Sequence, residues 1–237
     1  MVSSAVRIAL VVPAWDEAGS IADVVRGFRA IERDGRPVLD LVVVADNGSR
    51  DGTGELATAA GATVVREPTP GYGRACLSAL DELRRLGPPE IVVFADGDGS
   101  NDPMDLIAVL SPIESGDVDF VVGARPRRMD EGSLTIPQRF GNVLACALMR
   151  GIHGGAFTDL GPFRAVRWAT LERLRMQDPT YGWTVEMQLK VLKLGIRYRE
   201  VDVRNHSRTR GRSKVSGTVK GVIGAGMKIL STVLRFR

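Results

Sequence analysis

Two aspartates separated by one glycine, Asp96 and Asp98, form the pattern in this sequence that most directly indicates chemistry. They follow an apolar, β-branched run at residues 91–94, and Pro103, a residue suited to the first turn of a helix, comes soon after. Carboxylates this close repel each other unless a cation or backbone N–H groups stabilise them. The spacing therefore predicts either a site for a hard divalent cation or a strand-to-helix turn capped by an aspartate.

Strand and helix patterns alternate along the first half of the chain, which is typical of a mostly parallel sheet. We expect strands at residues 6–12, 39–45, 62–66, 91–95 and 118–122, with Pro13 ending the first. We expect helices at residues 21–31, 54–60, 71–86 and 103–115, the first capped by Ser20. Functional loops of such sheets gather at the carboxyl ends of the strands, so Asp46 should share one rim with Asp96 and Asp98.

The second half of the chain has a less regular pattern. We expect helices at residues 139–152, 171–175 and 184–194, a strand with an internal turn at 158–166, and an edge strand at 196–203. A polar, basic loop at 204–214 precedes an amphipathic helix at 215–236, whose apolar residues recur at helical spacing. The sequence thus predicts one α/β domain over residues 1–203, followed by a basic loop and an amphipathic helix over residues 204–237.

Composition places the chain among globular proteins with a substantial core, because 44% of its 237 residues are hydrophobic and 25% are charged. The two cysteines, Cys76 and Cys146, lie in apolar helical contexts, which argues for a reduced compartment and against a disulfide framework or a zinc site. No uninterrupted apolar run reaches the length of a transmembrane helix, and no signal-peptide pattern precedes the first strand. We therefore expect a cytoplasmic protein.

Charge is distributed unevenly along the chain. Residues 204–237 carry nine lysines and arginines and no acidic residue, whereas the remaining residues carry 23 basic and 28 acidic side chains. A basic tail suits nucleic acid, anionic lipid or a phosphate-bearing substrate. Nucleic acid is the poorest of these, because the basic stretch lacks interleaved aromatic residues and the predicted rim is acidic.

Seven short segments, taken in order, resemble the family-2 glycosyltransferases of GT-A fold, in particular the dolichol- or polyprenyl-phosphate sugar synthases. They are VVPAWDE at 11–17, DNGSRDGT at 46–53, GYGRA at 71–75, DGD at 96–98, GAR at 123–125, DLGPFRA at 159–165 and GWTVEM at 182–187. The resemblance covers nearly the whole chain and implies a Rossmann-like GT-A fold. Residues 1–125 would then form the half that binds the nucleotide sugar and the metal, and residues 126–203 the acceptor half.

The resemblance also implies roles for the donor side of the site. The residues implied to bind the donor are Pro13, Ala14 and Glu17 around the nucleoside, Asp46 as acceptor for the base N–H, Gly71 and Gly73 where the backbone approaches the donor, and Arg74 at a phosphate. Asp96 and Asp98 would hold Mg²⁺ or Mn²⁺ on the donor diphosphate, since oxygen ligands select a hard ion. We expect Asp98 to be the direct ligand. The ion would offset charge on the leaving nucleoside diphosphate.

The acceptor decides which further residues the reaction needs. A polyprenyl or dolichyl phosphate is already anionic and needs cations rather than a general base. The candidates for this acceptor-phosphate site are Arg125, Arg139, Arg210, Arg212, Ser213 and Lys214. A small soluble hydroxyl acceptor, such as a natural product or a sugar phosphate, would instead need a carboxylate base, for which Asp159 and Glu186 compete.

Departures from the family pattern keep both acceptors open. Many lipid-phosphate members carry C-terminal transmembrane helices, whereas this sequence shows one amphipathic helix, which is compatible with peripheral contact at the inner face of the membrane. The chain also lacks the Gln-x-x-Arg-Trp motif, which argues against a processive polysaccharide synthase. A nucleotidyltransferase or a non-catalytic nucleotide-binding module is the alternative from another class. Such proteins usually carry a glycine-rich, Lys- or Arg-bearing loop after the first strand, where this chain has PAWDE.

Overall fold

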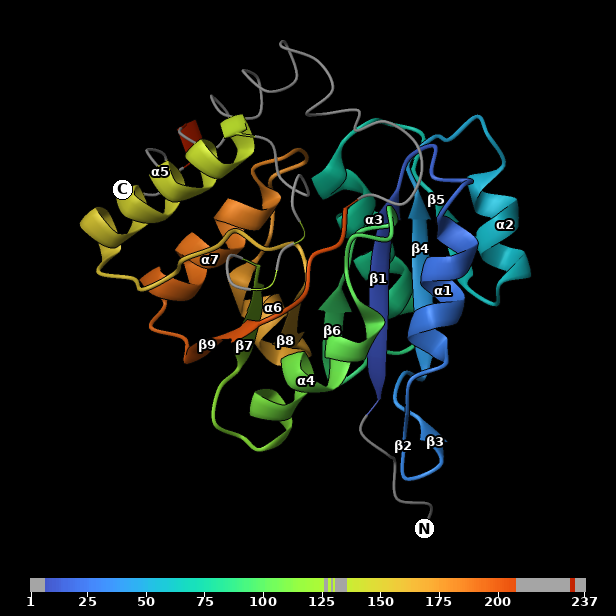
Figure 1. The fold of residues 1–237 in the computed structure, drawn as a ribbon, viewed down its shortest axis with the longest axis horizontal. Helices are drawn as coiled ribbons and strands as arrows, with labels where there is room; N and C mark the ends of the chain where they lie inside the picture. The colour runs from blue at the N-terminus through green and yellow to red at the C-terminus, as the bar shows by residue number, and fades with distance from the viewer. Residues whose placement is uncertain (1–6, 126–127, 129, 131–135, 208–230, 233–237) are drawn as a thin grey trace.

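Seven strands form one mixed sheet in the order β5-β4-β1-β6-β8-β7-β9 (Figure 1). The structure, a computed structural model, describes residues 7–125, 128, 130, 136–207 and 231–232. The strands of the sheet are β1 (Ile8–Ala14), β4 (Leu41–Asp46), β5 (Thr63–Arg66), β6 (Ile91–Phe94), β7 (Phe120–Ala124), β8 (Arg164–Arg167) and β9 (Tyr198–Asp202). The neighbours β5, β4, β1 and β6 run parallel, β8 runs antiparallel to both β6 and β7, and β9 runs parallel to β7.

Helices cover both faces of this sheet (Figure 1). They are α1 (Ile21–Arg29), α2 (Thr53–Ala59), α3 (Tyr72–Leu86), α4 (Leu106–Glu114), α5 (Ile136–His153), α6 (Trp168–Leu174) and α7 (Trp183–Lys193), with a short 3-10 helix η1 (Pro103–Asp105) before α4. Alternate side chains of β1 serve different cores: Ala9 and Val11 pack with the core that contains α3, and Leu10 and Val12 with the core that contains α1 and α4. Both faces of the central strands are therefore buried, which explains their continuous apolar runs.

The predicted α/β fold and the edge strand are confirmed, since β9 closes one side of the sheet. Pro13 does not end the first strand, which continues to Ala14. Because the two last positions of β1 pair with the end of β4, the proline lies inside the strand. A small hairpin of β2 (Glu32–Arg33) and β3 (Arg36–Pro37) was not predicted. Its turn is formed by an Asp-Gly pair with positive φ at both residues, as a tight hairpin requires.

Ser20 occupies the predicted N-cap position of α1, but its side chain does not cap the helix. Its hydroxyl instead donates to the carbonyl of Gly97 at 2.8 Å, and so ties the start of α1 to the loop after β6. The predicted helix at 215–236 and most of the basic loop lie outside the described residues. Within the part of the chain that the structure describes, every helix is too short or too polar to cross a membrane.

Candidate active site

A pocket of about 200 Å³ opens at the carboxyl ends of β1, β4 and β6. Its lining residues are Pro13, Ala14, Trp15, Glu17, Asn47, Pro70, Gly71, Tyr72, Ala75, Asp96, Gly97, Asp98 and Tyr181. The pocket therefore combines carboxylates with three aromatic rings, two of which, Trp15 and Tyr181, are exposed. The predicted donor-side residues Pro13, Ala14, Glu17 and Gly71 meet the two aspartates here, in the crevice where open α/β sheets bind ligands.

Hydrogen bonds hold the loop that carries the two aspartates. The backbone N–H of Asp96 donates to Asn101 Oδ1 at 2.8 Å, and the N–H of Ser100 donates to Asp98 Oδ1 at 2.9 Å. The hydroxyl of Tyr72 donates to Asp96 Oδ1 at 3.3 Å. Burial and the nearby Asp96 charge raise the pKa of Tyr72 well above its usual range, which keeps this hydroxyl protonated as a donor.

The oxygen donors of Asp96 and Asp98 suit a hard ion such as Mg²⁺ or Mn²⁺. Among the described residues, no group of three His, Cys, Asp or Glu side chains converges as a complete metal site. A divalent ion bound by this pair would therefore take further ligands from a diphosphate or water. The alternative prediction, an aspartate-capped turn, is correct for a neighbouring residue, since Asp102 Oδ1 accepts from the N–H of Met104 at 3.0 Å.

The turn after β4 holds the loop after β1, which lines the pocket, by hydrogen bonds. Asp46 is buried, and its Oδ1 accepts from the N–H of Ser49 at 2.9 Å; it is not among the pocket-lining residues. Thr53 and Ser49 accept from the N–H groups of Glu17 and Asp16 at 2.8 and 2.9 Å, and so fix the loop after β1. The structure thus shows Asp46 organising the turn, and its predicted contact with a nucleobase stays a prediction.

Asn47, whose role sequence reasoning missed, joins the turn after β4 to the loop at residues 67–71. Its Nδ2 donates to the carbonyls of Glu67 and Thr69 at 3.0 and 2.8 Å, and its Oδ1 accepts from the N–H of Gly71 at 2.7 Å. The amide therefore fixes the loop that leads into α3. Its place in the turn after β4 was the available signal, but its partners lie 20 to 24 positions away in the sequence.

The glycines at the start of α3 make room for another part of the protein. A Cβ at Gly73 would lie 1.9 Å from the carbonyl oxygen of Asp178, and one at Gly71 would lie 2.3 Å from that of Pro179. The N–H of Arg74 donates to this Pro179 carbonyl at 3.1 Å, while the Arg74 side chain is exposed. The segment at 177–182 therefore packs directly on α3, and this packing is the reason that the structure shows for glycine at position 73.

Glu186 holds the same segment from its other side. This buried carboxylate accepts from the N–H groups of Gln177 and Asp178, at 3.0 and 2.7 Å, and pairs with Lys190 at 2.6 Å. It does not line the pocket. Its observed contacts are those of a positioning residue for the segment that brings Tyr181 to the pocket, and a role as general base receives no support from its placement.

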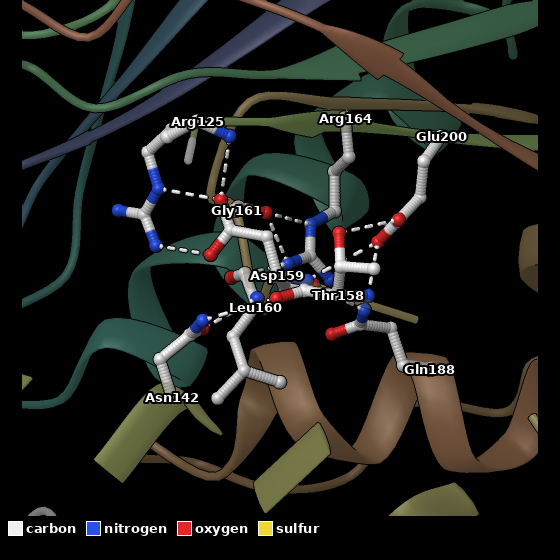
Figure 2. A network of polar contacts seen from close by, with 9 residues as sticks. All are labelled: Arg125, Asn142, Thr158, Asp159, Leu160, Gly161, Arg164, Gln188 and Glu200. Carbon is white, nitrogen blue, oxygen red and sulfur yellow. Dashed lines mark hydrogen bonds and ion pairs between the residues drawn. The ribbon is translucent and has the colours of Figure 1, made fainter. Parts of the chain in front are cut away.

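Asp159 forms a buried ion pair with Arg125 (Figure 2). Its carboxylate accepts from Arg125 Nε at 2.8 Å, from Nη2 at 2.7 Å and from the backbone N–H at 2.9 Å. The side chains of Arg125 and Asp159 are 13% and 1% exposed. Burial alone would raise the pKa of Asp159, but the charge and hydrogen bonds of Arg125 outweigh it and lower that pKa.

The same pair orients the Arg125 guanidinium. Figure 2 shows its third nitrogen pointing away from Asp159, and within the described part of the chain it donates to no acceptor. Burial disfavours the charged form, yet the charge of Asp159, and beyond it that of Asp96, raise the pKa of Arg125. Arg125 is thus a fixed cation within electrostatic reach of an aspartate that lines the pocket.

A second arginine behind this pair, Arg164, was missed as a site residue. It is buried, and its guanidinium donates to the carbonyls of Leu160 and Gly161 (Figure 2). It also donates to the carbonyl of Thr184 at 3.1 Å. Burial lowers its pKa to about 10. Arg164 therefore joins the turn that carries Asp159 to the first turn of α7.

The remaining predicted cations lie elsewhere. Arg139 is exposed on α5, and the structure does not bring it to the pocket lining. Arg210, Arg212, Ser213 and Lys214 lie outside the described residues. Arg125 does not line the pocket either, but its charge interacts with that of Asp96, which does.

Two relatives with similar sequences are a glycosyltransferase and a mannosyltransferase by name. The chain is 33% identical over 222 residues to an uncharacterized glycosyltransferase of Mycobacterium tuberculosis, covering 91% of this chain and 93% of that one. It is 27% identical to the undecaprenyl-phosphate mannosyltransferase of Micrococcus luteus, covering 91% and 90% of the two chains.

Solved structures show the same fold. Glucosyl-3-phosphoglycerate synthase from Mycobacterium tuberculosis, solved with Mn²⁺, UDP and glucosyl-3-phosphoglycerate, superposes with a TM-score of 0.74 at 21% identity. The match covers 97% of this chain and 79% of that one. Residues 9–175, which include the aspartate pair, Arg125 and Asp159, match the family described as glycosyl transferase family 2. Sequence, fold and pocket agree, and the chain belongs to glycosyl transferase family 2 and is a glycosyltransferase.

Proposed function

We propose that this enzyme transfers a hexose, with inversion, from a nucleotide sugar of the UDP-glucose or GDP-mannose type to a polyprenyl or dolichyl phosphate. The observation that carries the proposal is that both candidate bases are buried and already hydrogen-bonded within the protein. Asp159 and Glu186 are also each paired with a cation, Arg125 and Lys190 respectively. An acceptor that arrives as an anion needs a cation and needs no base.

On the donor side, Pro13, Ala14 and Glu17 would contact the nucleoside, and Gly71 would lie against the donor. Asp46 would contribute to base recognition through the turn that it organises, and Arg74 would approach a phosphate. Asp96 and Asp98 would hold Mg²⁺ or Mn²⁺, which supplies Lewis-acid stabilisation of the leaving diphosphate. The structural neighbour solved with Mn²⁺ and UDP supports a divalent ion and a nucleotide donor in this fold.

On the acceptor side, Arg125 would bind the acceptor phosphate through its outward nitrogen. Arg139 and the basic stretch with Arg210, Arg212, Ser213 and Lys214 would extend this binding. The relative from Micrococcus luteus, named for undecaprenyl phosphate and alignable over nine-tenths of the chain, supports a lipid phosphate. The enzyme would then work at the cytoplasmic face of a membrane through peripheral contact.

A small phosphorylated acceptor is the second candidate. It is favoured by the likeness of 97% of this chain to a synthase solved with glucosyl-3-phosphoglycerate, a product that carries a phosphate. Both candidates share an acceptor with a phosphate group. They differ in whether the phosphate oxygen or a hydroxyl attacks the sugar.

One assay separates the candidates. Purified enzyme with Mn²⁺ is incubated with labelled UDP-glucose or GDP-mannose and with polyprenyl phosphate, polyprenol lacking the phosphate, or 3-phosphoglycerate. We expect an organic-extractable product from polyprenyl phosphate alone. A labelled product only in the water phase with 3-phosphoglycerate favours the second candidate, and equal transfer to polyprenol and polyprenyl phosphate refutes both.

A further inference from the structure

The residues that follow β9 return to the loop of the two aspartates. The N–H of Val203 donates to the carbonyl of Ala124 at 3.0 Å, and two positions later Asn205 forms an isolated antiparallel bridge with Asn101. The N–H of His206 then donates to the carbonyl of Ser100 at 2.9 Å. Residues 203–207, named the strut below, thus run alongside the loop at 95–102.

Side chains reinforce this contact. Asp105, in η1, accepts from the N–H of Arg204 at 2.6 Å with one oxygen and from Arg128 Nη1 at 2.9 Å with the other. His206 Nε2 lies 3.3 Å from Asp102 Oδ2. Asp105 is 6% exposed and Asn205 is 2% exposed, so water has little access to these two residues.

Two of the loop residues that the strut contacts, Ser100 and Asn101, also contact the aspartates. Ser100, which accepts from the strut through its carbonyl, donates its N–H to Asp98 Oδ1. Asn101, which bridges to the strut, accepts from the N–H of Asp96 with its side chain. Each aspartate is therefore linked to the strut through a single intermediate residue.

We propose that the strut is a positioning element for the metal-binding carboxylates. It acts through two positioning residues outside it: Asp105, which holds Arg204 of the strut, and Asn101, which bridges to Asn205 of the strut. This inference rests on the proposed function, because it takes Asp96 and Asp98 as the ligands of the donor-bound ion. Neither positioning residue needs to touch the donor. Groups that orient metal ligands in this way are worth roughly 10–100-fold in metal affinity.

The strut also has a particular place in the sequence. The basic stretch from position 208, which the proposed function gives to the acceptor phosphate, follows it directly. One short segment therefore joins the loop of the donor's metal ligands to the start of the acceptor's cations.

The test compares Asp105→Asn and Asn101→Ala with the wild type, and uses Asp117→Asn as a matched control. Asp117 forms an exposed pair with Arg199, in which both side chains are 51% exposed, so its carboxylate can be neutralised without disturbing the strut. The first measurement is Mn²⁺ affinity in the presence of UDP or GDP, followed by the electron paramagnetic resonance of free Mn²⁺. The second is amide hydrogen exchange of residues 95–102 in metal-free protein.

We expect both Asp105→Asn and Asn101→Ala to raise the Mn²⁺ dissociation constant roughly 10–100-fold and to speed exchange in the loop. Metal-free nucleotide binding should stay unchanged in both, and the control should match the wild type. The inference is overturned if the folded variants show faster exchange in the loop but bind Mn²⁺ with wild-type affinity. It is also overturned if amide exchange in the loop is unchanged in both variants. If the wild type binds no Mn²⁺ with either nucleotide, the proposed function fails, and the role of the strut in metal binding fails with it. The exchange data still show in that case whether the strut orders the loop.

Discussion

Replacing Asp159 by asparagine separates a positioning role for this residue from a catalytic one. The substitution keeps the size of the side chain but removes the charge opposite Arg125 and places an N–H₂ group near other donors. Breaking a buried ion pair by removing one partner costs about 3–5 kcal/mol. We expect a loss of about 3 kcal/mol, at the lower end of that range, because Arg125 is 13% exposed and water can solvate part of its charge.

Stability and kinetics are then measured on the same protein. A loss of this size in a domain of this length lowers the melting temperature by roughly 6–12 °C. If Asp159 positions Arg125, acceptor KM rises while kcat, assayed below the melting transition, falls less than about tenfold. If Asp159 is the general base, kcat falls by roughly 10²–10⁴-fold. A kcat loss of that size, with unchanged acceptor KM and unchanged stability, would refute the positioning role.

A double-mutant cycle with Arg125→Gln adds a control. Because both residues act through one contact, we expect the double variant to lose much less stability than the two single variants together. Asp117→Asn, at an exposed ion pair, should change stability by no more than about 0.5 kcal/mol. Additive losses at Arg125 and Asp159 would show that the pair is not the unit inferred from its three hydrogen bonds.

The pH dependence of stability follows from the same pair. The pKa of Asp159 in the folded protein lies below its ordinary value of 3.8, because the charge of Arg125 and its hydrogen bonds outweigh the effect of burial. The folded protein therefore binds this proton more weakly than the unfolded chain does, so the stabilisation is present above that value and is lost as the pH falls below it. The difference in melting temperature between wild type and Asp159→Asn should shrink on acidification below about pH 4. A constant difference would contradict this.

Four further substitutions test other parts of the site. Glu186→Gln removes the charge of a buried ion pair and should cost about 3–5 kcal/mol in urea unfolding, with a raised donor KM; unchanged stability would contradict its positioning role. Gly73→Ala places a methyl group against the carbonyl of Asp178 and should cost roughly 1–3 kcal/mol, read from the same unfolding curves. Asp98→Asn should lose more activity at limiting Mn²⁺ than Asp96→Asn, and the opposite order would show that Asp96 is the direct ligand.

The central strands could be predicted from the sequence because both of their faces are buried. The first five predicted strands lie within two residues of the observed ones, since runs such as that at 91–94 are apolar throughout. The rim was predictable for the same reason: parallel strands bring their carboxyl ends together, and Glu17, Gly71, Asp96 and Asp98 do share the pocket.

The partners of the polar side chains could not be predicted in this way. Ser20 carries the pattern of a helix cap, yet its hydroxyl bonds to Gly97, which is 77 positions away. Glu186 has the position of a first-turn acid on α7, but its oxygens accept from a segment that precedes the helix. The local sequence pattern identifies a side chain that needs a hydrogen-bond partner, and tertiary packing decides which group becomes that partner.

The tertiary contacts of Asp159 also bear on whether it can take a proton from the acceptor. Asp159 is a weak proton acceptor, because Arg125 occupies both of its oxygens and lowers its pKa. Taking a proton from a hydroxyl would require it to release part of that pair and leave a buried guanidinium uncompensated. An acceptor phosphate is already ionised at neutral pH, so the pair can stay intact and present Arg125 to it. The pairing that makes Asp159 a poor base also keeps Arg125 charged and fixed in place, which is what the proposed transfer to a phosphate oxygen requires of it.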